Sequence, residues 1–203
     1  MKYLNKLPIY EVHLDENDDI QRMTCISIVD DPAIEVDFQC FNKESKFTKD
    51  EMQHIITGPA IIADLPIYRF DYELGEYYVV FNKETIKKIV EKYSKDNLFN
   101  FVSLEHNGQL LDSKDIVMVE FFIKDSSKGI IPQGFEDVAD GSLFVSYKVY
   151  NDELWNNILN STNLNGFSIE ITSELKPITL NKQTKEEDVD KVLEDIINGK
   201  IQL

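Results

Sequence analysis

The sequence predicts a β-rich α+β fold, a barrel or a sandwich flanked by helices, on three observations. Short apolar runs separated by turn residues fill most of the chain, as is typical of antiparallel or mixed β domains. Two segments instead repeat their apolar residues at helical spacing. The length of 203 residues and the 42% apolar content fit one globular domain, or one domain with a tail, whose core can form without disulfides or metals.

Ten apolar runs are expected to form strands. They are residues 10–14, 25–29, 36–41, 54–62, 67–70, 77–81, 101–106, 116–123, 143–149 and 167–172. A first helix is expected over 82–95, where Asn82 can cap the N-terminus and apolar residues recur at helical spacing. A second helix is expected over 152–159, with an exit at 163–166 that leads into the last strand.

The composition turns polar after Ser173, which places the end of the domain near residue 175. Residues 1–175 are then the β domain, and residues 176–203 are a polar linker and an amphipathic C-terminal helix. Thr184-x-x-Glu187 is a capping box for that helix, and Gly199 is its stop signal. The helix is expected to pack on its own domain; docking to a partner and removal during maturation are the alternatives.

The charge of the chain excludes some partners. With 37 acidic against 21 basic residues, the formal charge of -16 opposes binding to nucleic-acid phosphates. No apolar stretch approaches transmembrane length, and the first residues lead into no signal-like run. We expect a soluble, unexported protein without nucleic-acid or membrane partners.

No cofactor or metal is expected from the motifs. Cys25 and Cys40 have neither CxxC spacing nor a nearby histidine pair, so they are expected to be reduced, structural thiols. The patterns HExxH, GxGxxG, GxSxG and Walker A do not occur.

Glu120 is the only polar side chain in the eight-residue run 116–123. If both faces of that strand are buried, an unpaired carboxylate there would lose several kcal/mol of solvation or take up a proton. A partner is therefore expected, such as a histidine that the carboxylate orients for catalysis. The structural alternatives are an ion pair and a Glu120 side chain that reaches the rim of the sheet.

His106 and Ser168 are candidates for a base and a nucleophile. His106 ends the run 101–106 beside the Asn107-Gly108 turn signal, and alternation places it on the apolar face with Val102. Ser168 alternates with apolar residues in the run 167–172. A serine needs a neighbouring base, and His106 serves if the two strands are adjacent. A core histidine and a solvent-facing serine are the structural alternatives.

Six short runs between residues 25 and 172 carry a resemblance to a known family. They are SIVDDPA (27–33), GPA (58–60) with PIYR (66–69), EYYVVF (76–81), LEHN (104–107) and LNGFSIE (164–170). As an ordered set they resemble the prohead proteases of tailed phages, which are serine proteases of the herpesvirus assemblin type. The set includes His106 and, 62 positions later, Ser168 in a Gly-x-Ser context.

The resemblance implies an assemblin-like β-barrel in which Ser168 is the nucleophile and His106 the general base. Herpesvirus enzymes use a second histidine after the serine, but this chain has none beyond Ser168. Phage relatives use an acidic residue instead. Glu120 is the expected third member because a carboxylate in an apolar strand must be paired, and Glu170, two residues after Ser168, is the alternative.

The same resemblance implies substrates and a location. The substrates would be the scaffold protein, the major capsid precursor and the protease itself, inside an immature viral capsid in the host cytoplasm. The dimers formed by herpesvirus relatives imply a homodimer as one assembly state. Two other functions remain open: a noncatalytic capsid-assembly or scaffold-associated protein with the same fold, and a glycosidase built on a carboxylate pair.

Overall fold

The computed structural model describes residues 7–29, 47–160 and 164–178, and it has the expected β-rich α+β class. The strands of these residues are β1 (Ile9–His13), β2 (Met23–Val29), β3 (Thr48–Asp50), β4 (Ile55–Ile61), β5 (Ile67–Asp71), β6 (Gly75–Val80), β7 (Val102–Leu104), β8 (Ile116–Ile123), β9 (Leu143–Val149), β10 (Gly166–Ile171) and β11 (Glu174–Pro177). The helices are α1 (Lys83–Lys95), α2 (Asp152–Asn160) and the short 3-10 helix η2 (Ser126–Lys128).

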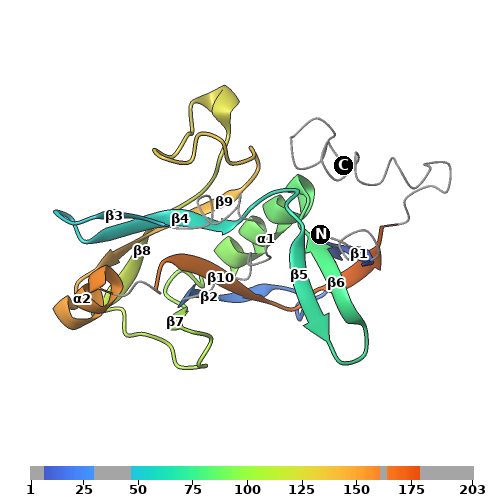
Figure 1. Ribbon diagram of the computed structural model, residues 1–203, viewed down its shortest axis with the longest axis horizontal. Coiled ribbons are helices and arrows are strands. Elements are labelled where there is room, and N and C mark those ends of the chain that lie inside the picture. Colours follow the sequence, from blue (N-terminus) through green and yellow to red (C-terminus); the bar gives the residue numbers. More distant parts are fainter. Residues whose placement is uncertain (1–6, 30–46, 161–163, 179–203) are drawn as a thin grey trace.

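The strands of the described residues form three sheets (Figure 1). The first has the order β11-β1-β6-β5, the second β10-β2-β7, and the third β3-β4-β9-β8. In the second sheet, β2 is the central strand, antiparallel to β10 and parallel to β7. This three-stranded sheet joins segments that lie far apart in the sequence.

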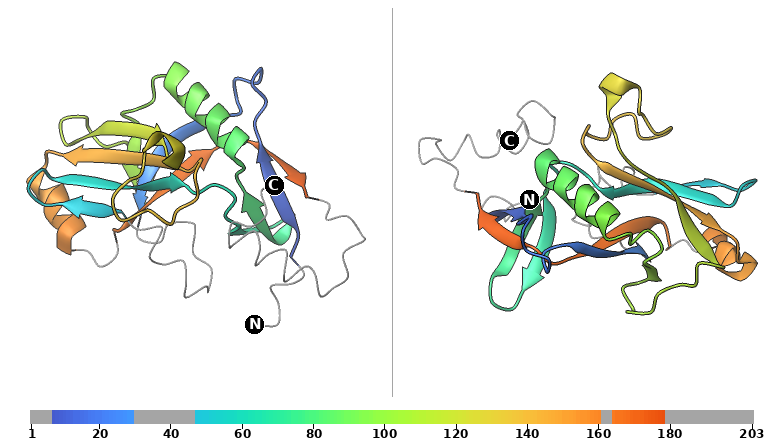
Figure 2. Two further views of the ribbon diagram at one scale, coloured as in Figure 1. Left: turned by 90° about the horizontal axis from the view of Figure 1, so that it is seen from above. Right: turned by 180° about the vertical axis from the view of Figure 1, so that it is seen from behind.

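Helix α1 begins and ends where its sequence predicts. The Asn82 side chain accepts a hydrogen bond from Thr85 N at 2.7 Å, which satisfies one of the free amides of the first turn. Asn97 adopts a left-handed φ of 56° just after the helix, as residues that end helices often do. Ile86, Ile89 and Tyr93 on one face are buried. The helix packs against β2 (Figure 2).

One hydrophobic core connects the sheets with both α-helices. It includes Ile26 and Ile28 of β2, Val145 and Tyr147 of β9, and Trp155 of α2. Ile26 and Ile28 alternate with Cys25 and Ser27 along β2. Because side chains of a strand alternate between faces, burying the two isoleucines directs the smaller residues to the opposite face.

Nine of the ten expected strands fall on described residues, and each overlaps an observed strand. The tenth, residues 36–41, lies outside the described residues, as does the C-terminal helix. Two short strands were not expected. They are β3, which pairs with β4, and β11, which pairs with β1 and runs to Pro177, past the expected domain end at 175.

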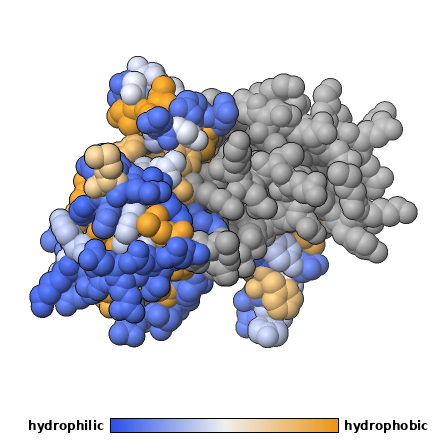
Figure 3. All heavy atoms as spheres, turned by 60° about the vertical axis from the view of Figure 1, so that its left-hand side comes forward, coloured by the Kyte–Doolittle hydropathy of each residue, from blue (hydrophilic) through white to orange (hydrophobic). Residues whose placement is uncertain are grey.

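The coloured surface in Figure 3 is mostly hydrophilic, with smaller hydrophobic groups between. This is the surface expected of a chain with 37 acidic and 21 basic residues.

The Tyr147 hydroxyl is buried and has no hydrogen-bond partner among the described residues. A hydroxyl buried in this way costs about 1 to 3 kcal/mol of desolvation. We therefore expect Tyr147→Phe to leave the free energy of unfolding unchanged or to raise it by about 1 kcal/mol, as measured by urea denaturation.

Tyr93→Phe is the matched control for that substitution. The Tyr93 hydroxyl donates to Leu98 O at 2.6 Å, so its removal is expected to cost about 1 kcal/mol. A Tyr147→Phe variant that loses as much stability as Tyr93→Phe would contradict the prediction.

Candidate active site

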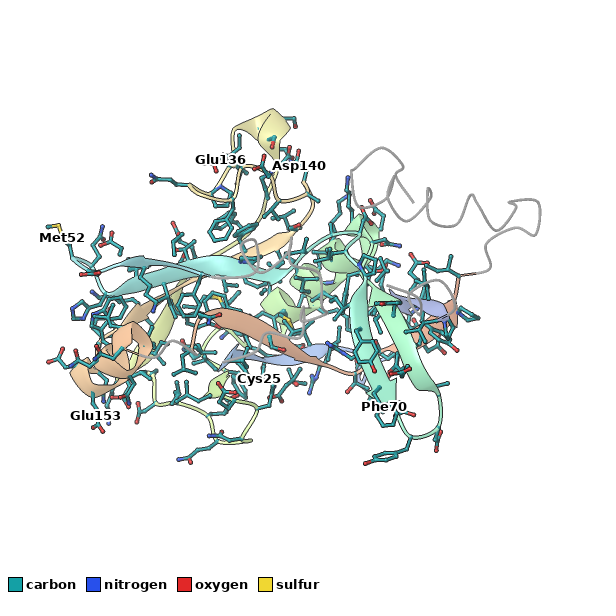
Figure 4. All side chains as sticks on the ribbon, in the orientation of Figure 1. Cys25, Met52, Phe70, Glu136, Asp140 and Glu153 are labelled. Atoms are coloured by element: carbon teal, nitrogen blue, oxygen red, sulfur yellow. The ribbon has the colours of Figure 1, made fainter. Side chains whose placement is uncertain are left out.

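A row of three serines crosses the β10-β2-β7 sheet. Ser168 on β10 is in register with Ser27 on β2, and Ser27 is in register with Ser103 on β7. Residues in register on neighbouring strands share a face, and the 2.7 Å between Ser27 Oγ and Ser103 Oγ agrees with this. All three side chains are buried, and Ser168 is the most exposed at 7%. Cys25, labelled in Figure 4, marks the part of β2 that carries this face.

His106 reaches the serine row from a strained turn after β7. Leu104 O accepts a hydrogen bond from Asn107 N at 3.0 Å, and the two central residues, Glu105 and His106, have φ values of 51° and 50°. This is a type I′ turn, which glycine and asparagine favour. Each residue with a side chain costs about 1–2 kcal/mol in the left-handed region. Strain of this kind gathers at functional sites.

The ring of His106 contacts a carboxylate and a serine through one nitrogen. His106 Nδ1 lies 3.1 Å from Glu170 Oε1 and 3.1 Å from Ser27 Oγ. Ser27 also donates to Glu170 Oε1 at 3.4 Å. About 38% of the His106 side chain and 39% of the Glu170 side chain are exposed, so the pair lies where a buried face opens to solvent. A carboxylate on Nδ1 can hold the tautomer in which Nε2 is free to accept a proton.

Ser168 lies beside both residues that contact the imidazole. Ser27 faces it across the β10–β2 pair, and Glu170 follows it by two positions on the same face of β10. The Ser168 hydroxyl makes no hydrogen bond to another described residue. Sites without a bound substrate often hold their catalytic hydrogen bonds long and close them only in the complex.

Glu120 does not lie in this cluster, and its expected apolar surroundings are wrong. It lies on β8 in another sheet, where its carboxylate accepts a hydrogen bond from Ser146, and the side chain is exposed. The physical reason is that β8 is an edge strand with a register shift between Met118 and Glu120. The adjacent Val119 is 47% exposed, so an apolar run did not mean a strand buried on both faces.

The expected face of His106 is also wrong. Alternation along an unbroken strand grouped it with Val102, but β7 ends at Leu104 and the turn redirects the imidazole. Its Nδ1 then contacts Ser27, which shares the face of Ser103. A reversal of direction within two residues breaks the period of two on which the expectation depended.

Ser27 is the site residue that the sequence analysis missed. Its side chain is 0% exposed and contacts Ser103, His106 and Glu170. A signal was present, because Cys25 and Ser27 put small, weakly polar side chains on one face of a strand whose other face carries Ile26 and Ile28. The partner strands, which give that pattern its meaning, are not visible in the sequence.

Ser27 and Ser168 differ in their relation to the two ring nitrogens. In a catalytic triad the acid holds one nitrogen and the nucleophile gives its proton to the other. Ser27 contacts Nδ1, the nitrogen that Glu170 also contacts. The remaining nitrogen, Nε2, makes no hydrogen bond to a described residue. Ser27 therefore does not meet the geometry of a nucleophile, which leaves Ser168 as the candidate of these two serines.

Two further observations describe the chemistry of the site. Burial raises the pKa of the Cys25 thiol, which stays protonated and can donate to Ser103 Oγ at 3.7 Å. Within residues 7–29, 47–160 and 164–178, no three His, Cys, Asp or Glu side chains are grouped so that they could hold a metal ion.

None of the helices in that part of the chain is long and apolar enough to span a membrane.

Comparison of the chain with family models, with curated proteins and with solved structures finds no match.

Proposed function

We propose that this protein is a serine endopeptidase with the triad Ser168, His106 and Glu170. The observation that carries the proposal is the 3.1 Å contact between His106 Nδ1 and Glu170 Oε1, next to Ser168 on the same face of the sheet. A base oriented by a carboxylate beside a serine is the arrangement that makes a serine hydroxyl nucleophilic.

In the proposed reaction, Ser168 Oγ attacks the carbonyl carbon of the scissile peptide bond. His106 Nε2 takes the hydroxyl proton and then gives it to the leaving amine, while Glu170 stabilises the imidazolium through Nδ1–H. A water molecule next gives a proton to Nε2 as it attacks the acyl-enzyme ester. The carboxylic acid product leaves, and the proton returns to Ser168.

The resemblance to tailed-phage prohead proteases supplies the proposed substrates and setting. The protein would have the assemblin-like barrel and would cleave scaffold protein and the major capsid precursor inside the immature capsid in the host cytoplasm. A homodimer is part of this proposal.

A second function, that of a noncatalytic capsid-assembly protein, is favoured by one observation. The Ser168 side chain is only 7% exposed, and its hydroxyl makes no hydrogen bond to a described residue. In this alternative the serine row and His106 are a structural hydrogen-bond cluster, and no precursor is cleaved.

Replacing His106 separates the two functions. When the chain is coexpressed with a scaffold or capsid precursor of the same phage, His106→Ala is expected to reduce cleavage by about 10² to 10⁴-fold or more, because the general base is lost. The rate is followed by intact mass of the fragments. His106→Ala should keep a nearly native melting temperature, since 38% of the side chain is exposed.

His13→Ala is the matched control. His13 lies on β1, and its nearest charged partner is Glu174 at 4.0 Å. Cleavage should be unchanged in this variant. Equal cleavage by the His106→Ala variant and the unmodified chain would contradict the protease proposal.

A further inference from the structure

Ser27 is the centre of a hydrogen-bond network and has no role in the proposed triad. Its hydroxyl lies 2.7 Å from Ser103 Oγ, 3.1 Å from His106 Nδ1 and 3.4 Å from Glu170 Oε1. Both Ser27 and Ser103 are fully or almost fully buried, at 0% and 1% exposure. A buried hydroxyl with three polar neighbours has few orientations that satisfy all of them.

One arrangement of protons satisfies every contact of the network. Ser103 donates its proton to Ser27, and the Cys25 thiol has Ile26 O and Ser103 Oγ as acceptors. Ser27 then donates to Glu170 Oε1 and presents an oxygen lone pair to His106 Nδ1. A proton on Nδ1 meets two acceptors, the serine oxygen and the carboxylate.

The other tautomer fits this network poorly. Without a proton, Nδ1 would face the Glu170 oxygen at 3.1 Å with two acceptors opposed. Ser27 could then donate to Nδ1 only by withdrawing its proton from the carboxylate. The contacts therefore favour the ring with Nδ1 protonated and Nε2 free.

We infer that Ser27, supported by Ser103, is a positioning residue that holds His106 in the tautomer and orientation that a general base requires. Its part in catalysis rests on the proposed function, but its effect on the ring does not. Ser27 touches no reacting atom and acts only through His106 and Glu170.

The test is nuclear magnetic resonance of the imidazole nitrogens in the full chain labelled with ¹⁵N-histidine. A His106→Gln variant identifies the signals of His106 among the three histidines. At a pH where the ring is neutral, the unmodified chain is expected to show mainly the Nδ1–H form. Ser27→Ala should shift the tautomer ratio about five- to tenfold toward Nε2–H, the factor for one lost hydrogen bond.

Ser146→Ala is the matched control. Ser146 is also 0% exposed, pairs with a hydroxyl, that of Thr57, at 2.7 Å, and donates to a carboxylate, that of Glu120, but in another sheet. This variant should leave the His106 tautomer unchanged. Ser27→Thr keeps the hydroxyl and should keep the ratio of the unmodified chain.

Three results would overturn the inference: an unchanged ratio in Ser27→Ala, an equal shift in Ser146→Ala, or no recovery in a folded Ser27→Thr variant. If Ser27→Ala does not fold, as judged by circular dichroism, Ser103→Ala replaces it. That variant removes the donor to Ser27 and should shift the ratio in the same direction; an unchanged ratio would overturn the inference.

This readout needs no substrate, so its failure is distinct from failure of the proposed function. A ratio that depends on Ser27 in a chain that cleaves no precursor would support the positioning role and contradict the protease. In an active chain, Ser27→Ala should lower kcat about tenfold with little change in KM. An unchanged kcat would contradict its part in catalysis.

Discussion

Ser168→Ala is expected to abolish precursor cleavage while the domain stays folded. Removal of the nucleophile leaves only binding and electrostatic contributions, so the rate should fall by about 10⁴-fold or more. The hydroxyl has no partner among the described residues, so its loss should change the free energy of unfolding by less than about 1 kcal/mol. Coexpression with a scaffold or capsid precursor, followed by intact mass of the products, measures the effect.

Ser146→Ala is the control for Ser168→Ala, because it removes a buried hydroxyl from a different sheet. This control should cleave at the rate of the unmodified chain, apart from a small loss of stability. Cleavage that persists in the Ser168→Ala variant would exclude Ser168 as the nucleophile and direct attention to Ser27, the serine that contacts the ring.

Glu170→Gln and Glu120→Gln are expected to have opposite consequences. Glu170 contacts His106 Nδ1 at 3.1 Å, and an amide there can donate as well as accept, so it no longer fixes the tautomer. Cleavage should fall about 10²- to 10⁴-fold, measured as kcat/KM on a precursor peptide. Glu120 is exposed on β8 and accepts from Ser146, so its replacement should change kcat/KM by less than about twofold.

The pair of variants also decides between two carboxylates that the sequence could not separate. A large loss in Glu120→Gln with little effect of Glu170→Gln would contradict the geometry of the site. Both proteins should unfold at similar temperatures, since each replacement preserves the shape of the side chain and neither carboxylate is buried.

The sequence predicted those elements whose structure depends on consecutive residues alone. Strand β8 has the predicted bounds, residues 116–123. The N-terminal cap of α1 is Asn82, as expected. Alternation and helical spacing are properties of consecutive residues, so they need no knowledge of the rest of the chain. The same alternation places Ser168 and Glu170 on one face of their strand, and the register of β10 agrees.

The composition of the site depended on pairing between distant strands, which the sequence does not display. β2, β7 and β10 form one sheet although the residues in register, such as Ser27 and Ser168, are far apart along the chain. This pairing decides which carboxylate meets His106. The preference for Glu120 rested on its strand being covered on both faces, but β8 is an edge strand.

The position of His106 was hidden for a different reason. A pattern of alternation assumes that the strand continues, whereas the chain enters a type I′ turn formed by Glu105 and His106, which lack the usual turn composition. The Asn107-Gly108 signal predicted a turn two residues later. A strained turn built from two residues with side chains is where local sequence rules are expected to fail.

In the proposed mechanism Ser168 gives its proton to His106, and labelling with an alkyl fluorophosphonate tests this transfer. This reagent phosphonylates a serine that a neighbouring base activates, and peptide mass spectrometry locates the adduct. We predict one adduct, on Ser168, that is lost in His106→Gln and retained in His13→Ala. An adduct on Ser27 would contradict proton transfer from Ser168 to His106. So would a folded chain that cleaves its precursor but forms no adduct.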